Sequence, residues 1–320
     1  MRYQRCKHTE LMLSNVVLGT DGFGSSVEQE RAYALLDAYT DAGGNALDTA
    51  ECYSKWIPGG DHASENLLGK WIKEKKNRQE LFLSTKGGFY SYGMSPRLSR
   101  EEIFADLEGS LRRLGTDYVD IYWLHRDAPT LPVEDMMDTL ALAVRQGKVR
   151  YIGVSNWDCR RFHEANAYCQ SMGYPMLVGS QLQYSPATPN PEQNEPDLIL
   201  MNEREYEYFK EQEFAVFAYA AQAKGFFSQY EKGGKDALSV KAFSRYYNEK
   251  TVETYTQLKR LAEEKECSIG AMVIAALANQ YDFDTFPIVG CKTVEQLYDS
   301  LSGADIVLTE EEWRTIKKDW

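Results

Sequence analysis

Short apolar runs alternate with amphipathic stretches along nearly the whole chain, and this order constrains the fold more than any other feature. The runs that start at residues 46, 81, 119, 149, 178 and 215 are separated by 35, 38, 30, 29 and 37 residues, which is the length of one strand–helix unit. Such alternation predicts parallel strands joined by helices, and eight units predict a closed (β/α)8 TIM barrel rather than an open sheet. The eight expected strands are Val16–Thr20, Ala46–Ala50, Leu81–Lys86, Val119–His125, Val149–Asn156, Val178–Tyr184, Ala215–Ala221 and Phe286–Gly290.

Several of the segments between these runs carry helix start and stop signals. Ser99 to Glu102 has the Ser-x-x-Glu pattern of a capping box, and the apolar residues that follow recur every three or four positions until Gly115. Ser26–Gln29 is expected to begin another helix. Thr293–Gln296 and Thr309–Glu312 repeat the capping pattern near the C-terminus. These signals place helices between the expected strands.

We expect a single α/β domain that spans residues 1–320. The segment before Val16 is expected to form a short N-terminal hairpin or arm outside the barrel. The gap between the strand starts at 215 and 286 is 71 residues, so the seventh unit contains an insertion, expected at Gly225–Asn248 together with two helices. Pro186–Pro196, which is rich in Pro and Asn, is expected to be a loop, and the C-terminal residues are expected to form a helical tail.

The net charge limits the classes of partner. The sequence has 36 Lys and Arg residues against 48 Asp and Glu residues, which gives −12. This balance disfavours nucleic acid, because binding to phosphate backbones needs a cationic surface, although a few local cations would hold a small phosphorylated ligand. No apolar run approaches the ~18 residues of a membrane span, and the N-terminal residues lack the hydrophobic region of a signal peptide. We therefore expect a cytoplasmic protein with no membrane partner.

The six cysteines are scattered without a Cys-x-x-Cys pair, and the four histidines do not occur at metal-ligand spacing. In a long chain without a secretion signal, this pattern is typical of free thiols rather than of disulfides or a zinc site. We therefore expect no dedicated metal site.

Polar residues occur where several of the expected strands end, which is the part of a barrel that carries chemistry. Asp48 and Lys86 end neighbouring strands, so each can compensate the buried charge of the other. Tyr53 follows in the next loop, and a cation beside its phenol is expected to lower its pKa. Tyr53 could then act as an acid–base group, and His125, at the end of a further strand, could orient a substrate oxygen.

Polar residues continue around the expected barrel at Ser155, Asn156, Gln181, Tyr219 and the turn from Gly290 to Lys292. Structural explanations exist for some of them. Ser155 and Asn156 would also suit a turn with a helix cap, and Thr293 with Gln296 would also suit a capping box. Lys292 lies just before this expected helix start, where amides and the helix dipole favour a phosphate.

Several motifs in this order resemble those of the aldo-keto reductases over nearly the whole chain: DTAECY (48–53), STK (84–86), YWLHR (122–126), GVSN (153–156), QLQY (181–184) and AYAAQAKGFF (218–227). The resemblance implies a (β/α)8 barrel that uses NADPH to reduce carbonyl groups. It implies that Tyr53 donates the proton, that Lys86 lowers the pKa of Tyr53, that Asp48 pairs with Lys86, and that His125 orients the carbonyl.

The resemblance also implies where the cofactor binds. It assigns Ser155, Asn156 and Gln181 to the carboxamide and Tyr219 to stacking on the nicotinamide. It assigns the loop from Ala220 to Ser228 to the pyrophosphate. The full set of expected cofactor contacts is Gly19, Thr20, Asp21, Asp48, Ser155, Asn156, Gln181, Tyr219, Ala220, Ala221, Gln222, Gly225, Gly290, Lys292, Gln296 and Ser300.

This sequence departs from the family pattern in three places. Asp21 and Gly22 follow Thr20, where a bulky residue is usual, and Tyr219 is followed by Ala-Ala-Gln instead of Ser-Pro-Leu. Gln296 occupies a position that is often Arg. Lys292 is therefore the main candidate to bind the adenosine 2′-phosphate, so NADP(H) is favoured and NAD(H) is possible.

The leading hypothesis is a reductase of aldehydes, ketones or sugar-like carbonyls. Aromatic residues that could line its pocket are Trp56, Phe89, Tyr90, Trp157 and Phe226. The alternative is a cofactor-binding regulatory subunit that resembles the barrel subunits of some potassium channels. A metal-dependent barrel isomerase would need converging carboxylates that we cannot locate. A Rossmann dehydrogenase is disfavoured, because Gly22-Phe-Gly24 lacks the third glycine of the fingerprint and the four Tyr-x-x-x-Lys matches are expected by chance among 21 tyrosines.

Overall fold

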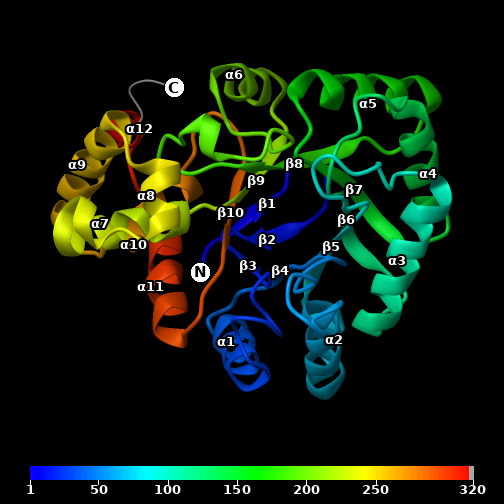
Figure 1. Ribbon diagram of the computed structural model, residues 1–320, viewed down its shortest axis with the longest axis horizontal. Helices are drawn as coiled ribbons and strands as arrows, with labels where there is room; N and C mark the ends of the chain where they lie inside the picture. The colour runs from blue at the N-terminus through cyan, green and yellow to red at the C-terminus, as the bar shows by residue number, and fades with distance from the viewer. Residues whose placement is uncertain (317–320) are drawn as a thin grey trace.

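The computed structural model describes residues 1–316, and its centre is a closed barrel of eight parallel strands in the order β10-β3-β4-β5-β6-β7-β8-β9. Figure 1 shows the helices arranged as a ring outside these strands. The strands are β3 (Val17–Gly19), β4 (Ala46–Asp48), β5 (Phe82–Gly87), β6 (Val119–Leu124), β7 (Val149–Ser155), β8 (Leu177–Gln183), β9 (Ala215–Tyr219) and β10 (Thr285–Val289). Each predicted strand is present, so the predicted (β/α)8 barrel is confirmed.

Helices follow the strands as the sequence signals predict. The first six are α1 (Gln29–Asp41), α2 (Ala63–Lys75), α3 (Arg100–Leu114), α4 (Val133–Arg145), α5 (Cys159–Met172) and α6 (Glu203–Gln212), with a short 3-10 helix η1 (Arg78–Glu80) before β5. The capping box of α3 is confirmed, because Ser99 and Glu102 each bind the backbone N–H of the other. The predicted start of α1 was slightly wrong: the N-cap is Glu28 and no side chain caps this helix.

The seventh unit contains the predicted insertion. Between β9 and β10 lie η3 (Ala223–Gly225), α7 (Phe226–Gly233), η4 (Gly234–Ala237), α8 (Val240–Tyr246), α9 (Glu249–Glu264) and α10 (Ile269–Ala278). These helices form the yellow and orange group in Figure 1. The chain then ends in α11 (Val294–Asp305) and α12 (Glu310–Ile316), which are the predicted helical tail. Pro186–Pro196 is a loop that contains the short η2 (Pro191–Gln193).

The N-terminal arm is an antiparallel hairpin of β1 (Tyr3–Arg5) and β2 (Met12–Ser14). Its apolar side chains join a cluster that fills the interior of the barrel. This cluster contains Cys6, Leu11, Leu13, Val17, Ala46, Ile121, Trp123, Val178, Ala215, Phe217 and Phe286. The hairpin therefore closes the end of the barrel opposite to the carboxyl ends of the strands, and leaves those ends available for chemistry.

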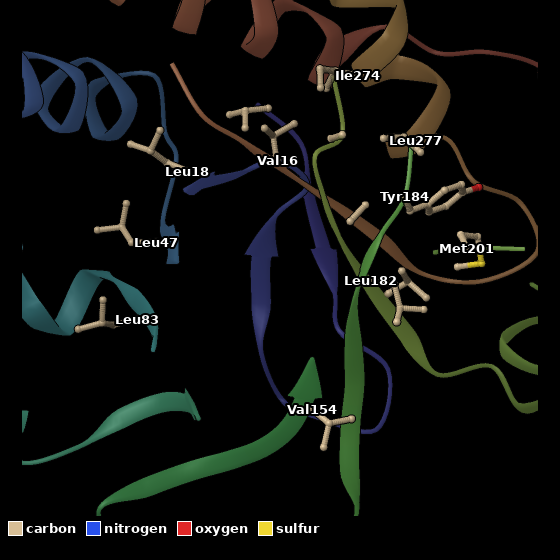
Figure 2. Packing of buried hydrophobic residues seen from close by; sticks show 14 of the residues in the cluster. Val16, Leu18, Leu47, Leu83, Val154, Leu182, Tyr184, Met201, Ile274 and Leu277 are labelled. Atoms are coloured by element: carbon tan, nitrogen blue, oxygen red, sulfur yellow. The ribbon is translucent and has the colours of Figure 1, made fainter. Parts of the chain in front are cut away.

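A second, larger cluster lies between the strands and the helices. In Figure 2, Leu18, Leu47 and Leu83 extend from three neighbouring strands into this layer. Successive residues of a strand point to opposite faces, so the residues next to these leucines point into the barrel. Asp48 follows Leu47 and continues the inward set that begins with Ala46. The strand period alone therefore directs the last residue of β4 into the barrel.

Within residues 1–316, no helix is long and apolar enough to cross a membrane.

Candidate active site

Lys86 is the centre of the polar cluster at the carboxyl ends of the strands. Its Nζ donates to Asp48 Oδ2 at 2.5 Å, to the Thr49 carbonyl at 2.7 Å and to Tyr53 Oη at 2.9 Å. Three acceptors match the three protons of an ammonium group. The juxtaposition of Asp48, Lys86 and Tyr53 that the sequence predicted is therefore present.

The other oxygen of Asp48 is also bonded. Asp48 Oδ1 accepts hydrogen bonds from Ser84 Oγ and from Gln181 Nε2, both at 2.7 Å. A buried carboxylate is tolerated when it is paired and its remaining lone pairs accept hydrogen bonds. These bonds fix the carboxylate, and the carboxylate fixes the ammonium beside Tyr53.

The pKa of Tyr53 does not follow the expectation from the sequence. Burial raises this pKa well above its ordinary value near 10, the charges of Asp48 and Asp21 raise it further, and the charge of Arg126 opposes them. The predicted lowering of the Tyr53 pKa was therefore wrong, because burial of the phenol, together with the charge of Asp48, outweighs the effect expected from a nearby cation. Tyr53 is a protonated phenol at neutral pH, the form that can donate a proton.

His125 lies beside the phenol, at the end of β6. The ring centroids of His125 and Tyr53 are 6.1 Å apart, and the ring of Phe89 lies 5.2 Å from the imidazole on another side. Burial lowers the pKa of His125 well below 6.5, and the charges of Lys86 and Arg126 lower it further. The imidazole is therefore neutral at physiological pH and can donate one hydrogen bond.

Arg126 is a functional candidate that the sequence interpretation missed. Its side chain is 9% exposed, its Nε donates to Asp197 Oδ2 at 3.1 Å, and its guanidinium lies 5.2 Å from the centre of the Phe89 ring. Arg126 thus connects the loop after β5 with the loop after β8, beside His125. Its place in the YWLHR motif was the available signal.

Ser155, Asn156, Gln181 and Tyr219 lie together at the ends of β7, β8 and β9. Ser155 Oγ donates to the Gln181 carbonyl at 3.1 Å, and Tyr219 Oη donates to Asn156 Oδ1 at 2.7 Å. Asn156 has a φ of 59°, which Asn tolerates better than most residues. This group offers amide and hydroxyl partners beside an aromatic ring, as binding of a carboxamide requires. Its role in cofactor binding stays a prediction.

Gly19 and Thr20 have structural explanations in addition to the predicted one. A Cβ at Gly19 would lie 2.8 Å from a methyl group of Ile288, so the close approach of β3 to β10 requires glycine. Thr20 is fully buried, and its hydroxyl donates to the Asp48 carbonyl at 3.1 Å. Asp21 is exposed and lies next to Gly290, where a Cβ would be 3.4 Å from Asp21 Oδ1. Among Gly19, Thr20 and Asp21, the first three expected cofactor contacts, only Asp21 has a side chain that a ligand can reach.

The loop after β9, which the resemblance assigned to the pyrophosphate, contains residues with positive φ. Ala220 has a φ of 53° and Gly225 a φ of 77°. Ala221 in the same loop is buried. Gln222 Nε2 donates to Ser300 Oγ at 3.0 Å, and Ser300 is 1% exposed. The hydrogen bond between Gln222 and Ser300 therefore attaches this loop to α11.

At the start of α11, Thr293 caps the helix as predicted by accepting from the N–H of Gln296. The side chain of Gln296 accepts from the backbone N–H of Lys292 at 2.9 Å. In a capping box the side chain of Gln296 would accept from the N–H of the N-cap, Thr293. Here it accepts from the N–H of Lys292, one residue earlier, so the expected capping box is incomplete. The side chain of Lys292 is exposed and makes no ion pair within the described chain, so it remains a candidate to bind a phosphate.

Three further cations were missed in the sequence. Helix α8, which carries Lys241 and Arg245, packs against η3, which carries Lys224. Partial desolvation lowers the pKa of Lys224, the charge of Asp21 opposes this, and the charges of Arg245 and Lys241 add to it. In the part of the chain that the structure describes, none of the three forms an ion pair. Lys224 lies in the loop that the resemblance assigned to the pyrophosphate, but the sequence carries no signal that α8 brings Lys241 and Arg245 near it.

The aromatic residues proposed for the pocket divide into two groups. Trp157 and Phe226 are fully buried: the indole N–H of Trp157 donates to the Arg126 carbonyl and Phe226 stacks on Tyr230, so both are packing residues. Trp56 is 59% exposed and its ring lies 6.4 Å from that of Tyr53. Phe89 and Tyr90 are partly exposed beside His125 and Arg126.

A separate cavity of about 560 Å³ lies between the loop after β8 and α9. Tyr184, Met201 and Tyr246 contribute to its lining, and no residue of the polar cluster does. The candidate active site is therefore the polar cluster at the strand ends and not this cavity. Among residues 1–316, no three His, Cys, Asp or Glu side chains are grouped to hold a metal ion.

The chain belongs to the aldo/keto reductase family, whose members are NAD(P)H-dependent oxidoreductases, because the model of that family matches residues 15–320. It is 30% identical over 311 residues to an aldo-keto reductase of Strobilurus tenacellus, which covers 94% of this chain and 84% of that protein. It is 30% identical over 315 residues to an aryl-alcohol dehydrogenase [NADP(+)] of Phanerodontia chrysosporium, and this match covers 91% of this chain and 76% of that protein.

A solved structure gives the same result for the fold. A thermostable aldo-keto reductase, crystallised with the inhibitor epalrestat, superposes with a TM-score of 0.74 at 29% identity and covers 99% of both chains. The predicted resemblance to this family is therefore confirmed over nearly the whole chain.

Proposed function

We propose that this protein is an NADPH-dependent carbonyl reductase in which Tyr53 is the proton donor. The observation that carries this proposal is the contact of Lys86 Nζ with Tyr53 Oη at 2.9 Å, in a cluster where Asp48 neutralises the ammonium and His125 is adjacent. A phenol, a cation and a neutral imidazole at one point can together protonate and orient a carbonyl oxygen.

When bound, the nicotinamide cofactor would supply the hydride. Tyr53 Oη gives its proton to the carbonyl oxygen as negative charge develops there. The phenolate that results is stabilised by Lys86, whose ammonium already contacts this oxygen. His125 donates a hydrogen bond to the same carbonyl oxygen and remains neutral.

The residues present fit such a cofactor. Ser155, Asn156 and Gln181 offer the amide and hydroxyl groups that a carboxamide needs, and Tyr219 offers a ring beside them. Lys224 in the loop after β9 would neutralise charge on the pyrophosphate, and Lys292 before α11 would contact the 2′-phosphate.

Aromatic carbonyl compounds are the substrate class that the rim of the site favours. Trp56 presents an exposed ring beside Tyr53, and Phe89 presents a partly exposed ring beside His125. A planar aryl group can pack against such rings. Relatives of this chain are named aryl-alcohol dehydrogenases and reductases, which supports an enzyme and disfavours the alternative of a regulatory subunit.

The test is turnover of NADPH by the purified protein with an aryl aldehyde, an aliphatic aldehyde and an aldose, followed by NADPH absorbance. We expect the aryl aldehyde to give the highest kcat/KM. If the protein bound NADPH but oxidised it with none of the three substrates, the result would favour the regulatory subunit instead.

A further inference from the structure

Cys52 directly precedes Tyr53, and its thiol contacts the imidazole of the site. Its Sγ lies 3.5 Å from Nδ1 of His125. Cys52 is 5% exposed and His125 is 9% exposed, so water has little access to this contact. Among residues 1–316, the thiol is the hydrogen-bond partner of the His125 ring.

The protonation states of the two groups determine the direction of this bond. Burial raises the pKa of Cys52 to about 12, and burial lowers the pKa of His125 well below 6.5. At neutral pH the pair is therefore a protonated thiol and a neutral imidazole with a single N–H. An unprotonated imidazole nitrogen is a stronger acceptor than sulfur, so the favourable arrangement has the S–H donating to Nδ1.

We propose that Cys52 is a positioning residue that holds His125 in the tautomer with its proton on Nε2, from which it donates a hydrogen bond to the substrate carbonyl oxygen. The inference rests on the proposed reductase function. In the other tautomer, Nε2 would present a lone pair to the carbonyl oxygen and repel it. The hydrogen-bond partner of Nδ1 thus determines whether Nε2 carries a proton and can donate a hydrogen bond.

The backbone around Cys52 gives this arrangement its rigidity. The N–H of Tyr53 donates to the Ala50 carbonyl at 3.2 Å, and the N–H of Lys55 donates to the Cys52 carbonyl at 3.1 Å. One turn therefore carries both the proton donor and the group that orients the histidine.

The tautomer can be measured directly by NMR on protein with ¹⁵N-labelled histidine. The chain has four histidines, so comparison with His125→Asn assigns the signals of His125. We expect Nε2 to be protonated in the wild type and in Cys52→Ser, whose hydroxyl can also donate. Cys52→Val, of similar volume but without a donor, should show a mixture of tautomers. A wild-type His125 protonated on Nδ1, or a Cys52→Val spectrum identical to the wild type, would overturn the proposal.

Kinetics with an aryl aldehyde provide the second measurement. Loss of one neutral hydrogen bond should lower kcat of Cys52→Val by about threefold to tenfold, while the Kd of NADPH stays the same. Cys52→Ser should stay within about twofold of the wild type. Cys169→Val is the matched control, because Cys169 is a buried thiol on α5, outside the site.

Equal losses of kcat in Cys52→Ser and Cys52→Val would mean that the thiol acts through packing, and would overturn the proposal. A wild type that binds NADPH but reduces no carbonyl would defeat the proposed function instead. The NMR measurement needs no turnover, so it would still decide the role of Cys52.

Discussion

Lys86 and Asp48 form an ion pair 2.5 Å long in which each side chain is only 2% exposed. Asp48 ends β4 and Lys86 is the residue before the end of β5, and these neighbouring parallel strands pair Asp48 with Ser84. Removal of one partner from a buried pair leaves an uncompensated charge, which costs more than the pair contributes. Asp48 therefore makes it possible for an ammonium group to remain buried at the point where it contacts Tyr53.

Tyr53→Phe should abolish carbonyl reduction. The phenol is the group that donates the proton, and loss of an acid catalyst lowers kcat by about 10²–10⁴-fold. The ring and its packing are retained, so we expect the Kd of NADPH to change by no more than a few fold. Rates measured with an aryl aldehyde, and cofactor titration by tryptophan fluorescence, check both parts. A variant that retains wild-type turnover would exclude Tyr53 as the donor.

Lys86→Met should lose activity and also stability. Asp48 would keep two of its hydrogen bonds but lose its counter-charge, at a cost of about 3–5 kcal/mol in the free energy of unfolding. We expect the melting temperature to fall by several degrees. The double variant Asp48→Asn with Lys86→Met removes both charges and should be more stable than Lys86→Met alone. A Lys86→Met protein with normal activity and stability would contradict this assignment.

Much of this site could be predicted because strand ends in a parallel barrel converge. Asp48, Lys86 and His125 each follow an apolar run whose alternation directs them inward, so their meeting needed only the barrel and its strand order. Tyr53 follows in the loop after Asp48, and the family resemblance gave it the role of proton donor. The structure confirmed the barrel, the hairpin, the insertion and the C-terminal helices from these patterns.

Other features depend on distances and burial that periodicity does not contain. The pKa of Tyr53 rises because burial and Asp48 outweigh the effect that a nearby cation would have in water. The cations of α8 lie beside Lys224 only because the insertion folds back onto η3. Trp157 and Phe226 looked like pocket residues but are buried, since an aromatic residue near a strand end can face either layer.

His125 should make stability fall in acid. Its pKa is near 6.5 in the unfolded chain and well below that in the folded protein, because of burial and the charges of Lys86 and Arg126. Above pH 6.5 neither state binds the proton, so the contribution is constant. As the pH drops below 6.5, the unfolded state binds it first, and the free energy of unfolding falls by up to about 1.4 kcal/mol per pH unit.

Urea denaturation of the wild type and His125→Asn between about pH 5 and 8 checks this dependence. The variant lacks the titrating group, so its stability should fall less steeply below pH 6.5. Parallel curves for the two proteins would show that His125 does not resist protonation in the folded state.

Lys292 and Lys224 are expected to contact different phosphate groups of the cofactor. Lys292 precedes α11, where the 2′-phosphate is expected, and Lys224 lies in the loop expected to cover the pyrophosphate. NADPH and NADH share the pyrophosphate, but only NADPH has the 2′-phosphate. We therefore expect Lys292→Ala to weaken NADPH binding by about tenfold to a hundredfold and leave NADH almost unchanged, whereas Lys224→Ala should weaken both cofactors by similar factors. Fluorescence titration of both cofactors with the wild type and each variant gives the four ratios, and exposed Lys70 on α2 serves as the matched Lys→Ala control. Equal losses for NADPH and NADH in Lys292→Ala would mean that Lys292 supports its loop and does not contact the 2′-phosphate.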